Sequence, residues 1–244
     1  SRKRNHRIAM THFLMVGASR GLGSVTQRLF KKNGIETTVL SRKKNDSFVD
    51  SYQHIDLSDL SQVRESIKKV LVKLGGISGV CFFQRLRDLD DTDDQNKELD
   101  VSLQSTRIII EEAVKFLDQE QDHSFVFVSS VNSRYVSIPA GIQYHLAKSG
   151  LDIAAKYYAV KYGHLGARFN TVNPGTFIKP NHNSQCQDPK TLTNKIANLS
   201  PLGRTTRADE IAELILFLAR PNSSAITGQN ITIDTGVSLR WPEN

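Results

Sequence analysis

Tyr144 and Lys148 stand four residues apart in the chain. Residues at this spacing lie on one face of a helix, so a phenol and an ammonium group can reach one reacting atom together. A free tyrosine titrates near ~10 and exchanges protons poorly at neutral pH, but a neighbouring lysine cation favours the phenolate. The pair suits general acid–base chemistry on a hydroxyl or a carbonyl, although the same spacing is more often a solvated surface pair.

An apolar segment near the N-terminus, 12–16, runs directly into a turn with three glycines, Gly17, Gly21 and Gly23. A helical pattern follows and ends near Gly34, a typical helix C-terminus. A strand, a glycine turn and a helix start together form a phosphate cradle, because glycines let the backbone approach a pyrophosphate and helix N–H groups face its charge. The turn therefore predicts a dinucleotide site, although such turns also occur without a ligand.

Together with the Tyr–Lys pair, this turn resembles the short-chain dehydrogenase/reductase family in its single-domain form. Further segments resemble the family in the expected order: Asp56-Leu57-Ser58 after the third strand, 126–130 as the fifth strand with a serine, 168–175 as the sixth strand with its Pro-Gly turn, and 226–236 as the last strand. The resemblance extends from about Phe13 to Leu239. It implies an α/β, three-layer, doubly wound Rossmann fold with a mainly parallel sheet flanked by helices on both faces.

The resemblance also implies roles for individual residues. In the reductive direction Ser130 would hydrogen-bond the substrate carbonyl, Tyr144 would donate the proton, and Lys148 would favour the phenolate and hold the nicotinamide ribose. Ser102 aligns with an asparagine of the family's proton relay and is the fourth catalytic candidate. The residues expected to contact the cofactor are Gly17, Ser19, Arg20, Gly21, Leu22, Gly23, Ser41, Arg42, Asp56, Leu57, Phe83, Tyr144, Lys148, Pro174, Gly175 and Phe177. No metal site is expected.

The second predicted strand is followed by Ser41-Arg42-Lys43-Lys44 and by no carboxylate. NAD-selective proteins place an acidic residue here to bind the ribose hydroxyls. A 2′-phosphate would instead meet Ser41, Arg42 and Arg20, and arginine binds phosphate through charge-assisted, often bidentate contacts. We therefore expect NADP as the cofactor; the alternative, a basic surface loop, applies mainly to Lys43 and Lys44.

The chain departs from the family pattern near the expected site. After the fourth strand, Phe83, Gln84 and Arg85 replace the usual Asn-Asn-Ala-Gly, whose small residues leave room for the adenine ribose. Ser102 replaces the relay asparagine and lacks the amide's two-sided hydrogen bonding, although a water held by a kinked helix could serve in its place.

Two smaller departures concern the residues before the glycine turn and before Tyr144. Val16 replaces a threonine, with the loss of one hydroxyl. Ser130 stands about one residue further from Tyr144 than we expect, so Ser129 and Ser133 remain alternatives to it.

Composition favours one α/β domain. The chain has 244 residues, of which 39% are hydrophobic, enough for one sizeable core. Apolar strand-like runs alternate with amphipathic helical runs, which is typical of a parallel sheet covered on both faces. No apolar run is long enough to cross a membrane, and the two cysteines do not suggest a disulfide framework. We therefore expect a cytoplasmic protein.

The net charge of +7 could suggest a nucleic-acid partner, but its distribution argues against one. Four of the positive charges lie ahead of Met10, in a segment (1–9) without periodicity that we interpret as an expression remnant or a disordered tail. Without those four charges the remainder carries +3, which is ordinary for a globular enzyme. We expect a single Rossmann domain over 10–244, with neither a nucleic-acid nor a membrane partner.

These observations predict an NADP-dependent oxidoreductase that interconverts an alcohol and a carbonyl. The alternative is a catalytically weak NADP-binding protein with a regulatory or scaffold role, which Ser102 and the missing Asn-Asn-Ala-Gly favour. A nucleotide-sugar epimerase or dehydratase would need a substrate domain for which the chain has no room. The family resemblance also implies a homotetramer or a homodimer.

We expect a polar, anionic substrate, such as a phosphorylated or carboxylated sugar-like compound. Ligands of open α/β sheets lie beyond the carboxyl ends of the strands, and several donors follow those ends. They are Arg85, Arg87, Arg134, Tyr135, Lys179 and His182, with His145 beside Tyr144. Converging cations bind carboxylate or phosphate, whereas a lipophilic substrate would need an apolar mouth. The alternative is that some of these cations point to solvent or pair with the acidic run 88–94.

Overall fold

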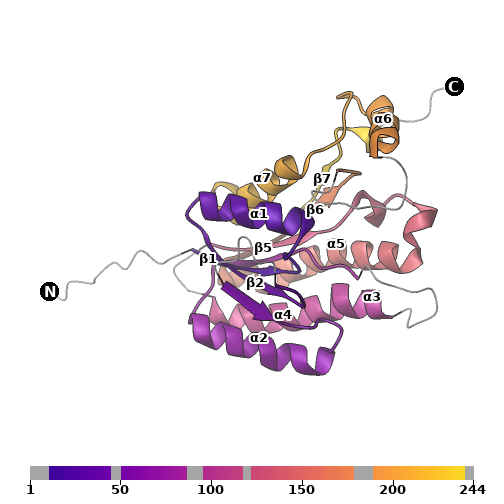
Figure 1. Ribbon diagram of the computed structural model, residues 1–244. Helices are drawn as coiled ribbons and strands as arrows, with labels where there is room; N and C mark the ends of the chain where they lie inside the picture. The colour runs from indigo at the N-terminus through magenta and orange to yellow at the C-terminus, as the bar shows by residue number, and fades with distance from the viewer. Residues whose placement is uncertain (1–10, 45–50, 87–95, 118–121, 179–188, 240–244) are drawn as a thin grey trace.

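The computed structural model describes residues 11–44, 51–86, 96–117, 122–178 and 189–239, with the backbone alone for 189–193. Within these residues, seven parallel strands form one sheet in the order β3-β2-β1-β4-β5-β6-β7 (Figure 1). The strands are β1 (His12–Val16), β2 (Glu36–Ser41), β3 (Ser51–His54), β4 (Gly79–Phe82), β5 (His123–Val128), β6 (Ala167–Pro174) and β7 (Asn230–Ile233). The predicted parallel, doubly wound α/β fold is confirmed.

Helices connect the strands and cover the sheet on both faces. They are α1 (Gly21–Lys32), α2 (Leu60–Leu74), α3 (Lys97–Leu99), α4 (Ser105–Ala113), α5 (Ile142–Tyr162), α6 (Pro189–Leu199) and α7 (Ala208–Ala219). Figure 1 shows α1 and α7 on one side of the sheet and α2, α4 and α5 on the other.

Strand β1 shows how the sequence produces two cores. Its side chains alternate, so Phe13 and Met15 pack towards α1 and α7, while Leu14 and Val16 pack towards α2, α4 and α5. All four are fully buried, which explains why the strand reads as a continuous apolar run.

The helix ends and apolar faces agree with the sequence pattern. Helix α1 ends at Lys32, and Gly34 follows with φ +71°, a conformation that glycine adopts without strain. Helix α2 buries Val63, Ile67 and Leu71 in the core, which agrees with the amphipathic helical runs expected from the sequence. The local signals and the tertiary packing therefore point to the same fold.

The direction in which the chain adds strands reverses at the centre of the sheet, between β1 and β4. The chain runs outward from β1 through β2 to β3 and then returns to pair β4 with β1. Ligands of open α/β sheets bind at such a reversal, beyond the carboxyl ends of the strands. The connection after β4 enters a helical run in which a π-helical segment, Asp100–Gln104, joins α3 to α4. Helix α5 packs against α3 and this segment.

Candidate active site

The glycine turn between β1 and α1 is shaped by close backbone contacts. A Cβ atom on Gly17 would lie 2.7 Å from the backbone nitrogen of Gln84, and the residue has φ +74°. A Cβ on Gly23 would lie 2.4 Å from the Cα of Ala18. Helix α1 begins after Arg20, with no side chain capping its first N–H groups and no acidic residue in its first turn. N–H groups at the start of a helix whose first turn carries no acidic residue suit a phosphate.

A cavity of about 460 Å³ lies beside this turn. Half of the residues expected to bind the cofactor line it: Gly17, Ser19, Arg20, Ser41, Arg42, Asp56, Leu57 and Phe83. Its wall also contains Lys43, Lys44, Ile55, Ser58, Gln84, Arg85, Leu86 and Val101. The other expected cofactor residues do not line this cavity; they are Gly21, Leu22, Gly23, Tyr144, Lys148, Pro174, Gly175 and Phe177.

The cationic part of the cavity lies at the end of β2. Arg42 lies close enough to Asp56 for its charge to act on the carboxyl group. Burial raises the pKa of Asp56, but hydrogen bonds from Ser58 and the charges of Arg42 and His54 outweigh it, so this pKa lies below its ordinary value. The Ser41 hydroxyl donates its proton to the carbonyl of Lys43 at 2.8 Å. Ser41 therefore holds the turn, whereas the sequence predicted a direct phosphate contact.

Gln84 fills the place where the family has small residues. It is 6% exposed, and its Nε2 donates to the hydroxyl of Thr106 at 2.5 Å. Its Oε1 is buried and has no hydrogen-bond partner among the described residues. A buried acceptor without a partner on a cavity wall fits a ligand that carries donors, such as ribose hydroxyls or an adenine amino group. The cavity therefore has the chemistry that a dinucleotide needs.

Lys148 is the more buried member of the Tyr144–Lys148 pair, which is called the catalytic group below. It is 4% exposed, and its Nζ donates to the carbonyl of Val128 at 2.8 Å. Burial lowers the pKa of Lys148 to about 8, while the charge of Glu98 acts in the opposite direction. Its Nζ lies 5.5 Å from the ring centroid of half-buried Tyr144, one helical turn earlier on α5. The pair predicted from spacing is therefore brought together.

The three candidate serines have different surroundings. Ser130 is buried after β5, and its hydroxyl accepts from the backbone N–H of Asn132 at 3.1 Å. The Ser129 hydroxyl donates to the carbonyl of Lys148, and Ser133 accepts from the side chain of Asn173. The hydroxyls of Ser130 and Ser133 accept in these contacts and keep a proton for a ligand, whereas Ser129 donates its proton to a backbone carbonyl.

Ser102 lies in the π-helical segment and is fully buried. Its hydroxyl donates to Oε1 of Glu98 at 2.7 Å, and Oε2 of Glu98 accepts from the backbone N–H of Leu86 at 3.0 Å. The proton of Ser102 is thus used by a carboxylate that the sequence reading did not consider. The available signal was a glutamate four residues before Ser102, on the same helical face.

Several residues expected at the substrate mouth have other contacts. The Nδ1 of His145 lies 2.6 Å from the carbonyl oxygen of Gly141, and its Nε2 accepts from the N–H of Ser137 at 3.0 Å, so both ring nitrogens hold the loop before α5. The hydroxyl of Tyr135 donates to the carbonyl of Ser238 at 3.3 Å. In this structure both side chains contact backbone groups of the chain itself, which their predicted role as substrate donors did not include.

Arg85 is the expected cation that does reach the catalytic group. Its guanidinium carbon lies 4.4 Å from the ring centroid of Tyr144. Arg134 is exposed, and Arg87, Lys179, His182 and the acidic run 88–94 lie outside the described residues. In the segment that leads into α5, Val136 and Ile138 are more than three-quarters exposed.

The predicted nicotinamide side lies at the end of β6. Pro174 ends the strand, and a Cβ on Gly175 would lie 2.6 Å from the Cβ of Asp234, so only glycine fits at this position. Phe177 pairs with Thr206 in an isolated parallel bridge. The chain after β6 is therefore fixed by the segment that leads into α7.

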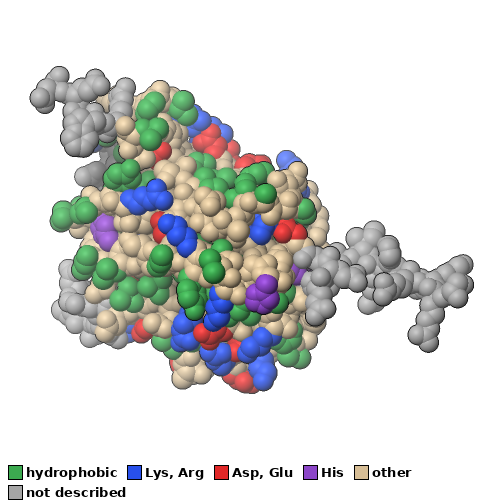
Figure 2. All heavy atoms as spheres, turned by 180° about the vertical axis from the view of Figure 1, so that it is seen from behind, with side chains coloured by type: hydrophobic (Ala, Val, Ile, Leu, Met, Phe, Trp, Pro, Cys, Tyr) green, Lys and Arg blue, Asp and Glu red, His purple; other side chains and the backbone are tan. Residues whose placement is uncertain are grey.

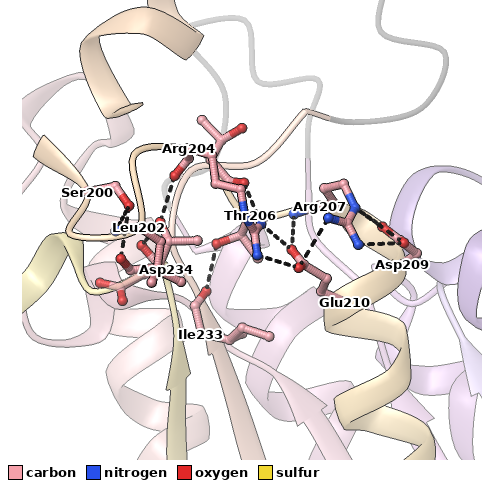
Figure 3. A network of polar contacts seen from close by, with 11 residues as sticks. Ser200, Leu202, Arg204, Thr206, Arg207, Asp209, Glu210, Ile233 and Asp234 are labelled. Carbon is pink, nitrogen blue, oxygen red and sulfur yellow. Dashed lines mark hydrogen bonds and ion pairs between the residues drawn. The ribbon is translucent and has the colours of Figure 1, made fainter. Parts of the chain in front are cut away.

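That segment is itself tied down by polar contacts (Figure 3). The guanidinium of Arg204 donates to both carboxylate oxygens of Glu210, at 2.9 and 2.7 Å, and the Thr206 hydroxyl donates to the carbonyl of Ile233 at 3.5 Å. The Arg204–Glu210 pair holds the start of α7, and the Thr206 contact joins this segment to the end of β7.

Among the described residues, no group of three or more His, Cys, Asp and Glu side chains could hold a metal ion. In the same part of the chain, no helix combines the length and the apolar character needed to cross a bilayer.

Comparison with known proteins identifies the family. Residues 17–238 match the family model described as enoyl-(acyl carrier protein) reductase. The chain is 28% identical to the 3-oxoacyl-[acyl-carrier-protein] reductase FabG of Thermotoga maritima over 93% of this chain and 97% of that protein. It superimposes on the ligand-free aldohexose dehydrogenase of Thermoplasma acidophilum with a TM-score of 0.86, 23% identity and 96% coverage of both chains. A gluconate 5-dehydrogenase from Burkholderia cenocepacia, solved with NADP and tartrate, gives a TM-score of 0.80 at 20% identity and covers 95% of this chain and 96% of its own. The predicted membership is confirmed: this oxidoreductase belongs to the short-chain dehydrogenase/reductase family, whose members use nicotinamide cofactors.

Proposed function

We propose that the protein is an NADP(H)-dependent enzyme that interconverts an alcohol and a carbonyl on an anionic substrate. The observation that carries the catalytic part is the placement of Tyr144 beside buried Lys148, with Ser130 at the end of the neighbouring strand. In reduction, Ser130 holds the substrate carbonyl and Tyr144 gives its proton to the carbonyl oxygen. The nicotinamide supplies the hydride when it is bound.

The preference for a 2′-phosphate is supported by the charges at the end of β2. Arg20, Arg42, Lys43 and Lys44 line the cavity, and β2 ends at Ser41 without a carboxylate. A ribose hydroxyl pair would find no acidic acceptor at this strand end, whereas a phosphate would find two guanidinium groups.

The preference for an anionic substrate is supported by Arg85. Its guanidinium covers one face of Tyr144, so a substrate carbonyl that reaches the phenol also comes within reach of a cation. Arginine binds carboxylate or phosphate through two parallel N–H donors, which would fix the orientation of such a substrate. The exposed side chains of Val136 and Ile138, in the segment before α5, would contact the carbon skeleton of the substrate.

The decisive experiment compares a 2-oxo acid with its methyl ester, using oxidation of NADPH as the assay. We expect turnover of the acid, with a KM at least tenfold lower than for the ester. Replacement Arg85→Leu should remove this difference, and Arg28→Leu, at an exposed position on α1, should preserve it. Equal kinetics for acid and ester in the parent protein would contradict the proposed substrate class.

A second candidate function is an NADP-binding regulator with little catalysis. The observation that favours it is the Ser102 hydroxyl, whose proton goes to Glu98 rather than towards a relay water. This candidate predicts cofactor binding without turnover of any carbonyl compound. A protein that binds NADPH but does not oxidise it across a broad carbonyl panel would support it over the enzyme.

We also propose that the protein forms a homo-oligomer through α5. Exposed apolar residues recur along one side of this helix: Ile142, Leu146, Ile153, Tyr157 and Val160. Figure 2 shows the molecule from behind, with apolar side chains exposed among the charged ones. Replacement Ile153→Lys should lower the mass measured by light scattering, whereas Val72→Lys on α2 should not.

A further inference from the structure

Glu98 is a buried acid that the mechanism above does not use. It is 3% exposed and lies in α3, immediately before the π-helical segment that carries Ser102. A carboxyl group removed from water is costly unless it is hydrogen-bonded or paired with a cation. Its position therefore requires an explanation from its surroundings.

Both oxygens of Glu98 accept hydrogen bonds. Oε1 accepts from the hydroxyl of Ser102 at 2.7 Å, and Oε2 accepts from the backbone N–H of Leu86 at 3.0 Å. Two donors aimed at two carboxylate oxygens match the ionised form, which can only accept. The Leu86 bond also ties α3 to the segment after β4, next to Arg85.

The charged groups that face this acid belong to the catalytic group or contact it. Burial raises the pKa of Glu98. The charges of Lys148 on α5 and of Arg85 after β4 act in the opposite direction. The charges of Glu98 and of Asp152, an acid on α5, in turn raise the pKa of Lys148, and the charge of Arg85 lowers it. The ring of Tyr144 lies against both cations. Glu98 is thus an acid whose charge acts on the two cations that contact the phenol of Tyr144.

Ser102 lies in the π-helical segment, which packs against α5, the helix that carries Lys148. Such segments are rare and occur mostly at functional sites. Here the hydroxyl of Ser102 is joined by a carboxylate from the preceding turn. The hydroxyl can donate and accept hydrogen bonds, and the carboxylate adds a group that can bind and release a proton.

We propose that Glu98 is a positioning residue for the catalytic pair: its charge keeps Lys148 protonated, and with Ser102 it forms the inner end of the path through which Tyr144 regains its proton. The first half concerns the protein alone, whereas the second half rests on the proposed reductase function. In the balanced sequence, Tyr144 loses its proton to the substrate oxygen and regains one from solvent by way of Lys148, and Glu98 is unchanged at the end.

The first test needs neither cofactor nor substrate. Protein labelled with ¹³C at lysine Cε is titrated by NMR, and the Lys148 signal is assigned by its absence in Lys148→Met. We expect the titration midpoint of Lys148 to fall by about one pH unit or more in Glu98→Gln, because an opposite charge has been removed. Glu98→Asp should stay closer to the parent. An unchanged midpoint in a folded Glu98→Gln protein would overturn the proposal.

A matched control is available on the same helical run. Glu112 is also buried, but it pairs with Arg64 and Lys115. Glu112→Gln should leave the Lys148 midpoint where it is in the parent; an equal shift there would mean that any buried acid has this effect and would overturn the proposal. If Glu98→Gln does not fold, Ser102→Ala tests the same link, because losing the donor to Oε1 weakens the ionised form of Glu98.

The second test measures the pH dependence of kcat in the reductive direction. Because the reaction needs protonated Lys148, the alkaline limb should move to lower pH in Glu98→Gln by the same amount as the NMR midpoint. A limb that stays in place while the midpoint moves would overturn the relay half. If the protein reduces no carbonyl compound, the proposed function fails, but the NMR titration still decides the first half.

Discussion

The guanidinium of Arg85 lies over the ring of Tyr144, with 4.4 Å between its Cζ and the ring centroid. A cation on an aromatic face contributes about 0.5–2 kcal/mol, depending on how far it is shielded from water. The contact joins the segment after β4 to the phenol on α5. The same side chain lines the cofactor cavity, so one arginine borders both the cavity and the reacting group.

Tyr144→Phe should abolish turnover while leaving the fold and NADPH binding nearly intact. The ring and its contact with Arg85 remain, and only the hydroxyl that donates the proton is lost. General acid catalysis contributes ~10² to 10⁴ in rate, so kcat should fall by that range. Stopped-flow measurement of NADPH oxidation and fluorescence titration of NADPH together check both halves. Comparable turnover in the variant and the parent would exclude Tyr144 as the proton donor.

Arg42→Asp should reverse the cofactor preference. The parent should bind NADPH at least tenfold more tightly than NADH, since ~1.4 kcal/mol corresponds to tenfold and one charge-assisted phosphate contact can supply it. An aspartate at this place would repel the 2′-phosphate and accept from the ribose hydroxyls. Fluorescence titration of both cofactors measures the change. Lys68→Asp, an exposed charge reversal on α2, is the control; a preference that survives Arg42→Asp would reject the assignment.

The parts of the structure that depend on local pattern could be predicted from the sequence. The glycine turn and the Tyr144–Lys148 pair follow from spacings within one element or turn, whereas the parallel sheet was expected from the alternation of strands and helices and from the family resemblance. Contacts between distant segments could not be predicted. The hydrogen bond from Leu86 to Glu98 and the contact of Arg85 with the ring of Tyr144 depend on the path of the backbone after β4.

The same limit explains two residues whose contacts in this structure were not predicted. His145 and Ser41 have side chains that suit a ligand, but each is also within reach of nearby backbone groups, and those contacts are made in this structure. Short polar side chains often bind their own turn in this way. Residue type alone does not separate the two outcomes, whereas the local geometry does.

Gly17→Ala and Gly34→Ala should have very different effects although both glycines have similar positive φ values, +74° and +71°. At Gly34 nothing lies within 4 Å of the added Cβ, so the cost is the left-handed conformation alone, about 1 kcal/mol. At Gly17 the Cβ would meet the backbone of Gln84 at 2.7 Å, and the turn must shift.

Urea unfolding and NADPH titration of both variants measure this contrast. We expect a clearly larger loss of unfolding free energy in Gly17→Ala, together with weaker cofactor binding, whereas Gly34→Ala should bind NADPH like the parent. Equal losses in the two variants would show that the close approach of the turn to Gln84 does not constrain it.

Lys148→Met should inactivate the enzyme yet stabilise its fold at neutral pH. Burial lowers the pKa of Lys148 from 10.5 to about 8, whereas the unfolded chain keeps the ordinary value. Between these two values the unfolded state binds more protons, so the stability of the parent rises as the pH increases through this range. Below pH 8 the cost of burying the ammonium group is fully present, and methionine removes it. The variant should therefore be more stable than the parent at pH 7 by about 1–3 kcal/mol, the lower end reflecting the lost bond to the carbonyl of Val128.

The difference between the two proteins carries the test, because the titrations that they share cancel. Urea unfolding at several pH values should show the advantage of Lys148→Met shrinking by up to about 1.4 kcal/mol per pH unit between pH 8 and 10.5. Lys156→Met, at an exposed position on the same helix, should show no such trend. A flat difference, or a parent that is more stable at pH 7, would mean that Lys148 is not held as a costly buried cation. If the trend is found, the charge of Lys148 lowers the stability of the fold. This is expected of a residue that is retained for chemistry rather than for packing.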